Sequence, residues 1–172
     1  MILDKLLTFS GGLGGAGDNL DAPTTGTQQA PTIIDLGVTS GVPSSANGGG
    51  ARDIGTGDDP AMKLSVLVTT AFASGTSLQL QLQGAPDNGS GVAGTWTTMW
   101  LSAAITEATL VAGMQLANID IPRPVPGQAL PRFLRLNYIT VGTHTAGQVE
   151  SQIVLDRDDQ VVGTTGLYSG YP

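Results

Sequence analysis

The stretch 131-PRFLRLNYITVGTHTAGQVESQIVLDRDDQ-160 decides the fold class of this chain. Apolar side chains recur with a period of two in both of its arms, at Leu134, Leu136 and Tyr138 and then at Val149, Ile153 and Leu155. This period is typical of β-strands with one buried face and one solvated face. The Gly/Thr-rich segment between the arms predicts a turn, so we expect a β-hairpin. No side chain in it is poised for chemistry, which favours a protein that packs and binds over an enzyme.

The composition supports an all-β protein with many turns. The chain has 172 residues, including 25 glycines and 10 prolines, and 12% of its residues are charged. This length predicts one domain over residues 1–172, and the glycine and proline content suits short strands joined by loops.

Other strand signals lie upstream of the hairpin. Alternating apolar residues occur at Met62, Leu64, Val66 and Val68, again at Leu78, Leu80 and Leu82, and within Thr95–Ser102. Thr32–Val38 is a shorter candidate, and a change of parity before Ile119 and Ile121 predicts a bulge or break near Ala117 and Asn118. These runs give about seven or eight short strands and no convincing helix. We therefore expect a two-sheet β-sandwich or jelly roll.

Long segments without strand patterns separate these runs. Residues 1–31 are expected to form an extended N-terminal arm and loop, residues 158–172 an extended C-terminal tail, and residues 39–57 a Gly-rich loop. Residues 84–94 are rich in turn formers, and residues 121–131 contain four prolines. In the arm, apolar contacts are expected from Ile2, Leu3, Leu6, Leu7 and Phe9.

Charge and composition exclude several classes of function. The net charge is -7, and its seven basic residues are scattered, so no basic stripe is available to neutralise nucleic-acid phosphates. The chain has no cysteine, which excludes disulfides and zinc-thiolate sites. Neither a signal peptide nor an apolar run long enough for a membrane span is recognised, so we expect synthesis in the cytoplasm and no membrane partner.

Three features resemble catalytic or cofactor sites but are better explained structurally. Residues 12–17 match G-x-G-x-x-G, yet the prolines and glycine that follow cannot form the helix that a dinucleotide requires. His144, the single histidine, is expected to be exposed in the hairpin turn. Glu150 is expected on the solvated face of its strand. We therefore predict no catalytic residue and no cofactor.

Acidic clusters and tryptophans remain as candidate binding features. Asp58 and Asp59, and the group Asp156, Asp158 and Asp159 around Arg157, lack the EF-hand pattern, and surface charge explains them better than a metal site. Trp96 and Trp100 lie four residues apart, so on one strand they share a face. They are expected to be core or interface anchors, with a sugar-stacking platform as the alternative.

Several stretches together resemble the capsid cement (decoration) proteins of tailed bacteriophages, the family typified by a Bordetella phage cement protein. The resemblance is carried by MILDKLLTFS at 1–10, RDIGTGDD at 52–59, LQLQLQGAPD at 78–87, WTTMWLSAAI at 96–105 and above all FLRLNYITVGTHTAGQVESQIVLD at 133–156. It covers most of residues 1–10, 32–38 and 51–159. The Gly-rich segments at 11–31 and 40–50 and the tail after Gln160 depart from the family pattern.

The resemblance implies a trimeric jelly-roll subunit on the outer capsid surface of a virion, bound to the major capsid protein where capsomers meet. We expect such a protein to cement neighbouring capsid subunits by burying surface on several of them at once. The expected interface residues are Ile2, Leu3, Leu6, Leu7, Phe9, Trp96 and Trp100. The alternatives are a carbohydrate-binding β-sandwich module of a tail or fibre that uses one of the tryptophans, and a β-sandwich hydrolase.

Overall fold

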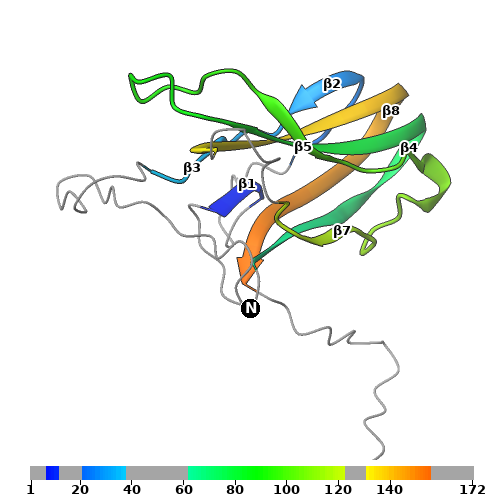
Figure 1. Ribbon diagram of the computed structural model, residues 1–172. Helices are drawn as coiled ribbons and strands as arrows, with labels where there is room; N and C mark the ends of the chain where they lie inside the picture. Colours follow the sequence, from blue (N-terminus) through cyan, green and yellow to red (C-terminus); the bar gives the residue numbers. More distant parts are fainter. Residues whose placement is uncertain (1–6, 12–20, 38–61, 123–130, 156–172) are drawn as a thin grey trace, which may run out of the picture.

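The structure confirms an all-β fold. The computed structural model describes residues 7–11, 21–37, 62–122 and 131–155 (Figure 1). The strands in these residues are β1 (Thr8–Ser10), β2 (Gly26–Gln29), β3 (Ile34–Asp35), β4 (Met62–Ala85), β5 (Thr97–Leu101), β6 (Ile105–Thr106), β7 (Gln115–Asp120) and β8 (Phe133–Leu155), with one 3-10 turn, η2 (Glu107–Thr109). All of the strand pairs are antiparallel.

Two long strands form the centre of the sheet. β4 has 24 residues and β8 has 23, and they pair from Met62↔Leu155 at one end to Ala85↔Phe133 at the other. Figure 1 shows them curving together through the molecule. The predicted hairpin between residues 131 and 160 is therefore wrong. The Gly/Thr-rich segment continues as a strand because β4 runs alongside it. β4 pairs with β8 both before and after the region where the register shifts, at Val68↔Val149 and at Ser77↔Val141.

Bulges divide this strand pair into two halves. The register shifts four times between Val68 and Ser77, in the region where β8 contains Gly142 and Gly147 at φ 78° and 132°. Bulges increase twist and bend a strand, so the sheet curls here and its two halves face each other. One half adds β1 and β7 to the long strands, and the other adds β2, β3, β5 and β6. The result is the expected sandwich of the jelly-roll type, although two of its strands are far longer than expected.

One apolar core fills the space between the two halves. The alternation predicted for β4 is confirmed, because Leu64, Val66 and Val68 and then Leu78, Leu80 and Leu82 are all fully buried. β8 contributes Leu134, Leu136, Tyr138, Val149 and Ile153 to the same core. The predicted interruption before Ile119 is also confirmed: Val66 pairs with Ala117 and Leu67 with Gln115, which leaves Leu116 as the extra residue.

The described parts of the expected N-terminal arm belong to the sheet. β1 pairs with the end of β8, and β2 pairs with Thr140 to Asn137 near its start. Phe9 is 0% exposed and Leu7 is 7% exposed, and both pack in this chain's own core. These two side chains are therefore buried within the subunit and do not extend from it as part of an arm. Ile2, Leu3, Leu6, residues 12–17, the acidic clusters at 58–59 and 156–159, the loop 39–57 and the tail 158–172 lie outside the described residues.

His144 is buried, which corrects the prediction of an exposed turn histidine. It lies within β8 at the curled corner, is 2% exposed, and contacts the ring of Phe72 edge-on with 5.0 Å between centroids. Its Nε2 lies 3.4 Å from the carbonyl oxygen of Ser77. Room for the ring comes from Gly75, because a Cβ at this glycine would lie 2.0 to 2.4 Å from the imidazole atoms.

This contact predicts a specific destabilisation by Gly75→Ala. Gly75 does not have a positive φ, so alanine is compatible with its backbone and the loss comes from the clash with His144. We expect a loss of about 1–3 kcal/mol in the free energy of unfolding, as for overpacked cores, measured by urea denaturation. In a His144→Ala background the same substitution should cost much less. Equal costs in the two backgrounds would contradict the proposed contact.

Candidate functional site

The outer surface of one half of the sandwich is rich in side-chain amides. Directly paired residues of antiparallel strands point to the same side of a sheet, so the registers of β2, β8, β4 and β5 define this surface. We call it the amide face, and its residues are Thr27, Gln29, Gln79, Gln81, Gln83, Thr98, Leu101, Arg135, Asn137, Ile139 and Val141. Leu101 and Val141 are 49% and 52% exposed, so the face presents apolar area among neutral polar groups.

Hydrogen bonds between strands fix the side chains of the amide face. The amide nitrogen of Asn137 donates to the Oε1 atoms of both Gln81 and Gln83, each at 3.0 Å. The Nε2 atoms of these two glutamines donate in turn to the hydroxyl of Thr98, at 3.0 and 3.4 Å. This network spans β8, β4 and β5 and holds the surface in one arrangement, which lowers the entropy lost when a partner binds.

Arg135 lies within this network and stacks on Trp96. Its guanidinium carbon is 4.3 Å from the centre of the Trp96 ring. Its Nε donates to Gln83 Oε1 at 2.7 Å, and its Nη1 donates to Gln29 Oε1 at 3.2 Å. Partial burial lowers the pKa of Arg135, and none of these partners carries a negative charge to offset it.

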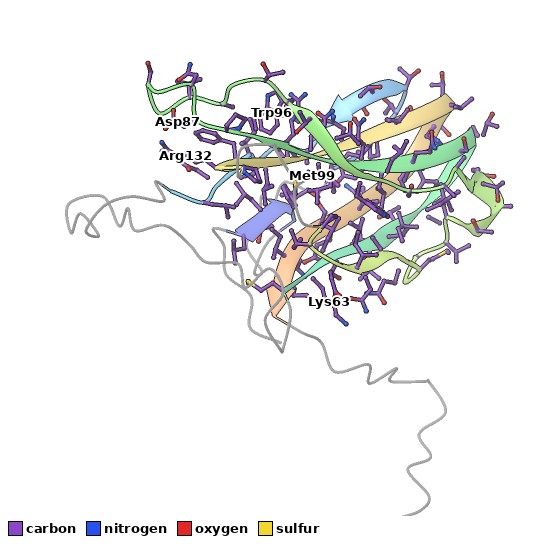
Figure 2. All side chains as sticks on the ribbon, in the orientation of Figure 1. Lys63, Asp87, Trp96, Met99 and Arg132 are labelled. Atoms are coloured by element: carbon purple, nitrogen blue, oxygen red, sulfur yellow. The ribbon has the colours of Figure 1, made fainter. Side chains whose placement is uncertain are left out.

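Arg132 joins the end of β3 to the loop between β4 and β5, at the edge of the same half of the sandwich (Figure 2). Its Nε and Nη2 donate to the two carboxylate oxygens of Asp35 at 2.8 and 2.9 Å, and its Nη1 donates to Asp87. The hydrogen bonds from Arg132 to Asp35 are the main cause of the raised pKa of Arg132. Such a fork is the geometry that guanidinium and carboxylate groups prefer.

Asp87 organises the loop between β4 and β5. Its Oδ1 accepts hydrogen bonds from the backbone N–H groups of Gly89 at 2.8 Å and Gly91 at 2.9 Å. Partial burial acts to raise the pKa of Asp87, but these bonds and the contact with Arg132 hold it below its usual range. The loop predicted over 84–94 is confirmed from residue 86 onward, whereas Gly84 and Ala85 are the last residues of β4. The loop is tied internally and to Arg132. Val92 at its tip is 58% exposed.

Trp96 and Trp100 lie on opposite faces, which corrects the expectation that they share one. Trp100 pairs with Leu82, whereas Thr98 pairs with Gln83, so a bulge at Met99 changes the parity of the strand. Trp100 is partly buried and packs against the apolar core. The Trp96 ring lies on the outer side, partly buried under Arg135. The two rings therefore cannot form one stacking platform.

A buried cluster of hydroxyls joins the two halves of the sandwich. Ser10 Oγ lies 2.7 Å from Ser151 Oγ and 3.1 Å from the hydroxyl of Tyr138, which is 2.8 Å from Ser151 Oγ. Burial raises the pKa of Tyr138 above its usual range.

Nearby, Asp21 exchanges backbone hydrogen bonds with Val149 at 3.2 and 2.9 Å, and its Oδ2 is buried without a hydrogen-bond partner. Burial raises the pKa of this carboxyl to about 6.

Glu150 lies on the outer face on which the sequence placed it. Glu150 pairs with Leu67 on the outer side of the other half, as the alternation predicted, and is half-buried.

Within the described residues, no three His, Asp or Glu side chains gather closely enough to hold a metal ion. In the same part of the chain, no helix is long and apolar enough to cross a membrane.

A family model, Bbp16, matches residues 23–153, from the segment that leads into β2 to Ile153 near the end of β8. The chain belongs to the Bbp16 family. This is a Bordetella phage protein family, so the resemblance to phage proteins predicted from the sequence is confirmed, and the protein is a structural protein of a phage virion. A comparison with curated proteins found no match to the chain. The match includes the amide face, Arg132 and its two carboxylate partners.

Sequence reasoning missed most of this surface. A signal for the amide face was present, since Gln79, Gln81 and Gln83 alternate with buried leucines and must share one outer face. The contacts of Arg132 had no comparable signal, because Asp35 and Asp87 are 97 and 45 residues away in the sequence.

Arg132→Gln is expected to release the loop that Asp87 organises. Glutamine cannot bind two carboxylates at once, so the loop loses its attachment and Asp35 and Asp87 repel each other. Faster amide hydrogen exchange is expected at Gly89 and Gly91, while the buried amides of β4 and β8 keep their protection. Unchanged exchange in the loop would show that Asp87 alone holds it. Asp120→Asn, on β7, is a control variant away from this loop.

Asp21→Asn is expected to stabilise the protein at pH 8. The pKa of this carboxyl rises from 3.8 to about 6 on folding, so the folded state binds the proton more tightly. Its contribution to stability is therefore fully present below about pH 4 and is lost as the pH rises through about 6. Asparagine mimics the neutral form. The gain in urea midpoint over the wild type should shrink as the pH falls from 8 to 4.

Glu107→Gln is the matched control for this prediction, since it removes one negative charge from η2. It should not reproduce the pH-dependent gain. A difference between wild type and Asp21→Asn that stays constant from pH 4 to pH 8 contradicts the role assigned to Asp21.

Proposed function

We propose that this protein is a capsid cement protein that binds the outer surface of a phage capsid as a homotrimer. It joins neighbouring copies of the major capsid protein and catalyses no reaction. Its membership of the Bbp16 family over residues 23–153 is the observation that carries this proposal. The region matched includes β4 and all but the last two residues of β8, and so spans the centre of the sandwich.

The roles of the charged and hydroxyl side chains support a binding function. Arg132 ties Asp87 in the loop between β4 and β5 to Asp35 at the end of β3, and the Tyr138 hydroxyl joins the two halves in the core. Each of these groups is engaged in shaping the subunit. A body fixed in this way presents a preorganised surface, which is what a protein that stabilises a shell by contact requires.

Simultaneous contacts explain how such a subunit strengthens a shell. Once one surface of a trimer is bound, its other subunits meet their sites at a high effective concentration, so modest contacts give tight retention. A trimer also matches a three-fold position on an icosahedral shell. The carbohydrate-binding alternative receives less support, because Trp100 packs inward and Arg135 covers one face of Trp96.

Adding the purified full-length protein to shells that lack it tests this proposal. We expect it to pellet with the shells at saturable occupancy and to raise the temperature at which they rupture. Light scattering during size-exclusion chromatography should give the mass of three chains. An unrelated acidic protein at the same concentration is the control. A monomer that neither pellets with shells nor changes their rupture temperature would falsify the proposed function.

A further inference from the structure

Arg135 is an isolated positive charge in a neutral part of an acidic protein. The chain has a net charge of -7, yet Arg135 is the one charged residue among those that define the amide face. The register of β3 places the carboxylate of Asp35 beside the end of this face, but Arg132 binds it. The net charge of the chain repels an approaching acidic surface. At the amide face it meets hydrogen-bonding amides and a single cation instead.

The guanidinium of Arg135 is preorganised but incompletely paired. Two of its N–H bonds donate to the side-chain oxygens of Gln83 and Gln29, and its flat face lies on the ring of Trp96. A guanidinium has five N–H donors, so three are left without an acceptor among the described residues. Arg132, three residues earlier, differs because it is neutralised by Asp35 and Asp87.

From this arrangement we infer that Arg135 binds a carboxylate of the major capsid protein and that the amide face docks around that contact. The inference rests on the proposed function and names the surface that performs it. The partner group is an Asp or Glu side chain, because a planar carboxylate accepts the parallel N–H bonds that a guanidinium offers. Stacking on Trp96 holds the guanidinium plane in place, so little further side-chain entropy is lost on binding.

The rest of the amide face fits a protein partner around this contact. The exposed side chains of Leu101 and Val141 supply apolar area that is buried on docking. Around them, the amides of Gln81, Gln83 and Asn137 offer both donors and acceptors. Excluding water from the rim strengthens a central charge contact, as in protein interfaces with an arginine at the centre.

Binding of Arg135→Gln to shells that lack the protein tests the inference. The substitution removes the charge and the fork but leaves an amide like its neighbours. Loss of one charged hydrogen-bonded contact should weaken shell binding by about tenfold to a hundredfold. Lys63→Gln is the matched control, because it removes the same charge at the far end of the molecule from Trp96 (Figure 2). It should bind like the wild type.

Arg135→Lys separates geometry from charge. Lysine keeps the charge but has neither the fork nor the planar stacking group, so binding between that of the wild type and Arg135→Gln is expected. It also serves as the test if Arg135→Gln fails to fold, which thermal unfolding reports. Raising the salt concentration should weaken the wild type more than Arg135→Gln.

Two outcomes overturn the inference alone, and a third also overturns the proposed function. If the wild type binds shells and both Arg135 variants bind equally well, the amide face is not the docking surface, while the proposed function stands. Equal loss in Arg135→Gln and Lys63→Gln shows dependence on net charge alone and also overturns it. If the wild type does not bind shells, the proposed function itself fails.

Discussion

The antiparallel pairing of β4 with β8 is the constraint on which the rest of the structure depends. Every other described strand is hydrogen-bonded to one of these two: β1, β2 and β3 to β8, and β5, β6 and β7 to β4. Strands of 24 and 23 residues would be too long for one flat sheet of this size, so they must bend. Bending at a single corner lets the same two strands serve both halves of the sandwich, and the core forms where their inner faces meet.

The corner also explains which features could be predicted from the sequence. Local alternation was sufficient for the buried faces of β4, since the period of two is a property of each strand alone. It failed at Gly142, where a glycine with positive φ has the same sequence signal in a turn as in a bulge. The difference depends on the partner strand, where Gly75 pairs with Gly142 from almost seventy residues upstream. His144 was misplaced for the same reason, because the space that its ring fills belongs to Gly75.

The candidate site shows the same limit. The alternating glutamines of β4 indicate an outer face, but its extent requires the registers of β2, β5 and β8. Counting four residues from Trp96 to Trp100 predicts one shared face, and a single bulge at Met99 reverses that result. A bulge of this kind has no strong sequence signal when neither glycine nor proline marks it. Arg132 could not be linked to Asp35 or Asp87 because these segments are far apart in the sequence and meet only after the strands pair.

Arg132 and Arg135 show how register assigns different roles to similar residues. Arg132 precedes β8, where the end of β3 and the loop between β4 and β5 each place a carboxylate, and its charge holds these two segments together. Arg135 points outward from within the strand, where its neighbours on β4 and β2 are glutamines, so its charge stays available to a partner. Because rigid strands rather than loops fix Arg135, the stability of the β4–β8 pair and the geometry of the proposed docking surface are coupled. A substitution at the corner that shifts the register of these strands should therefore displace Arg135 from Trp96 without touching either residue.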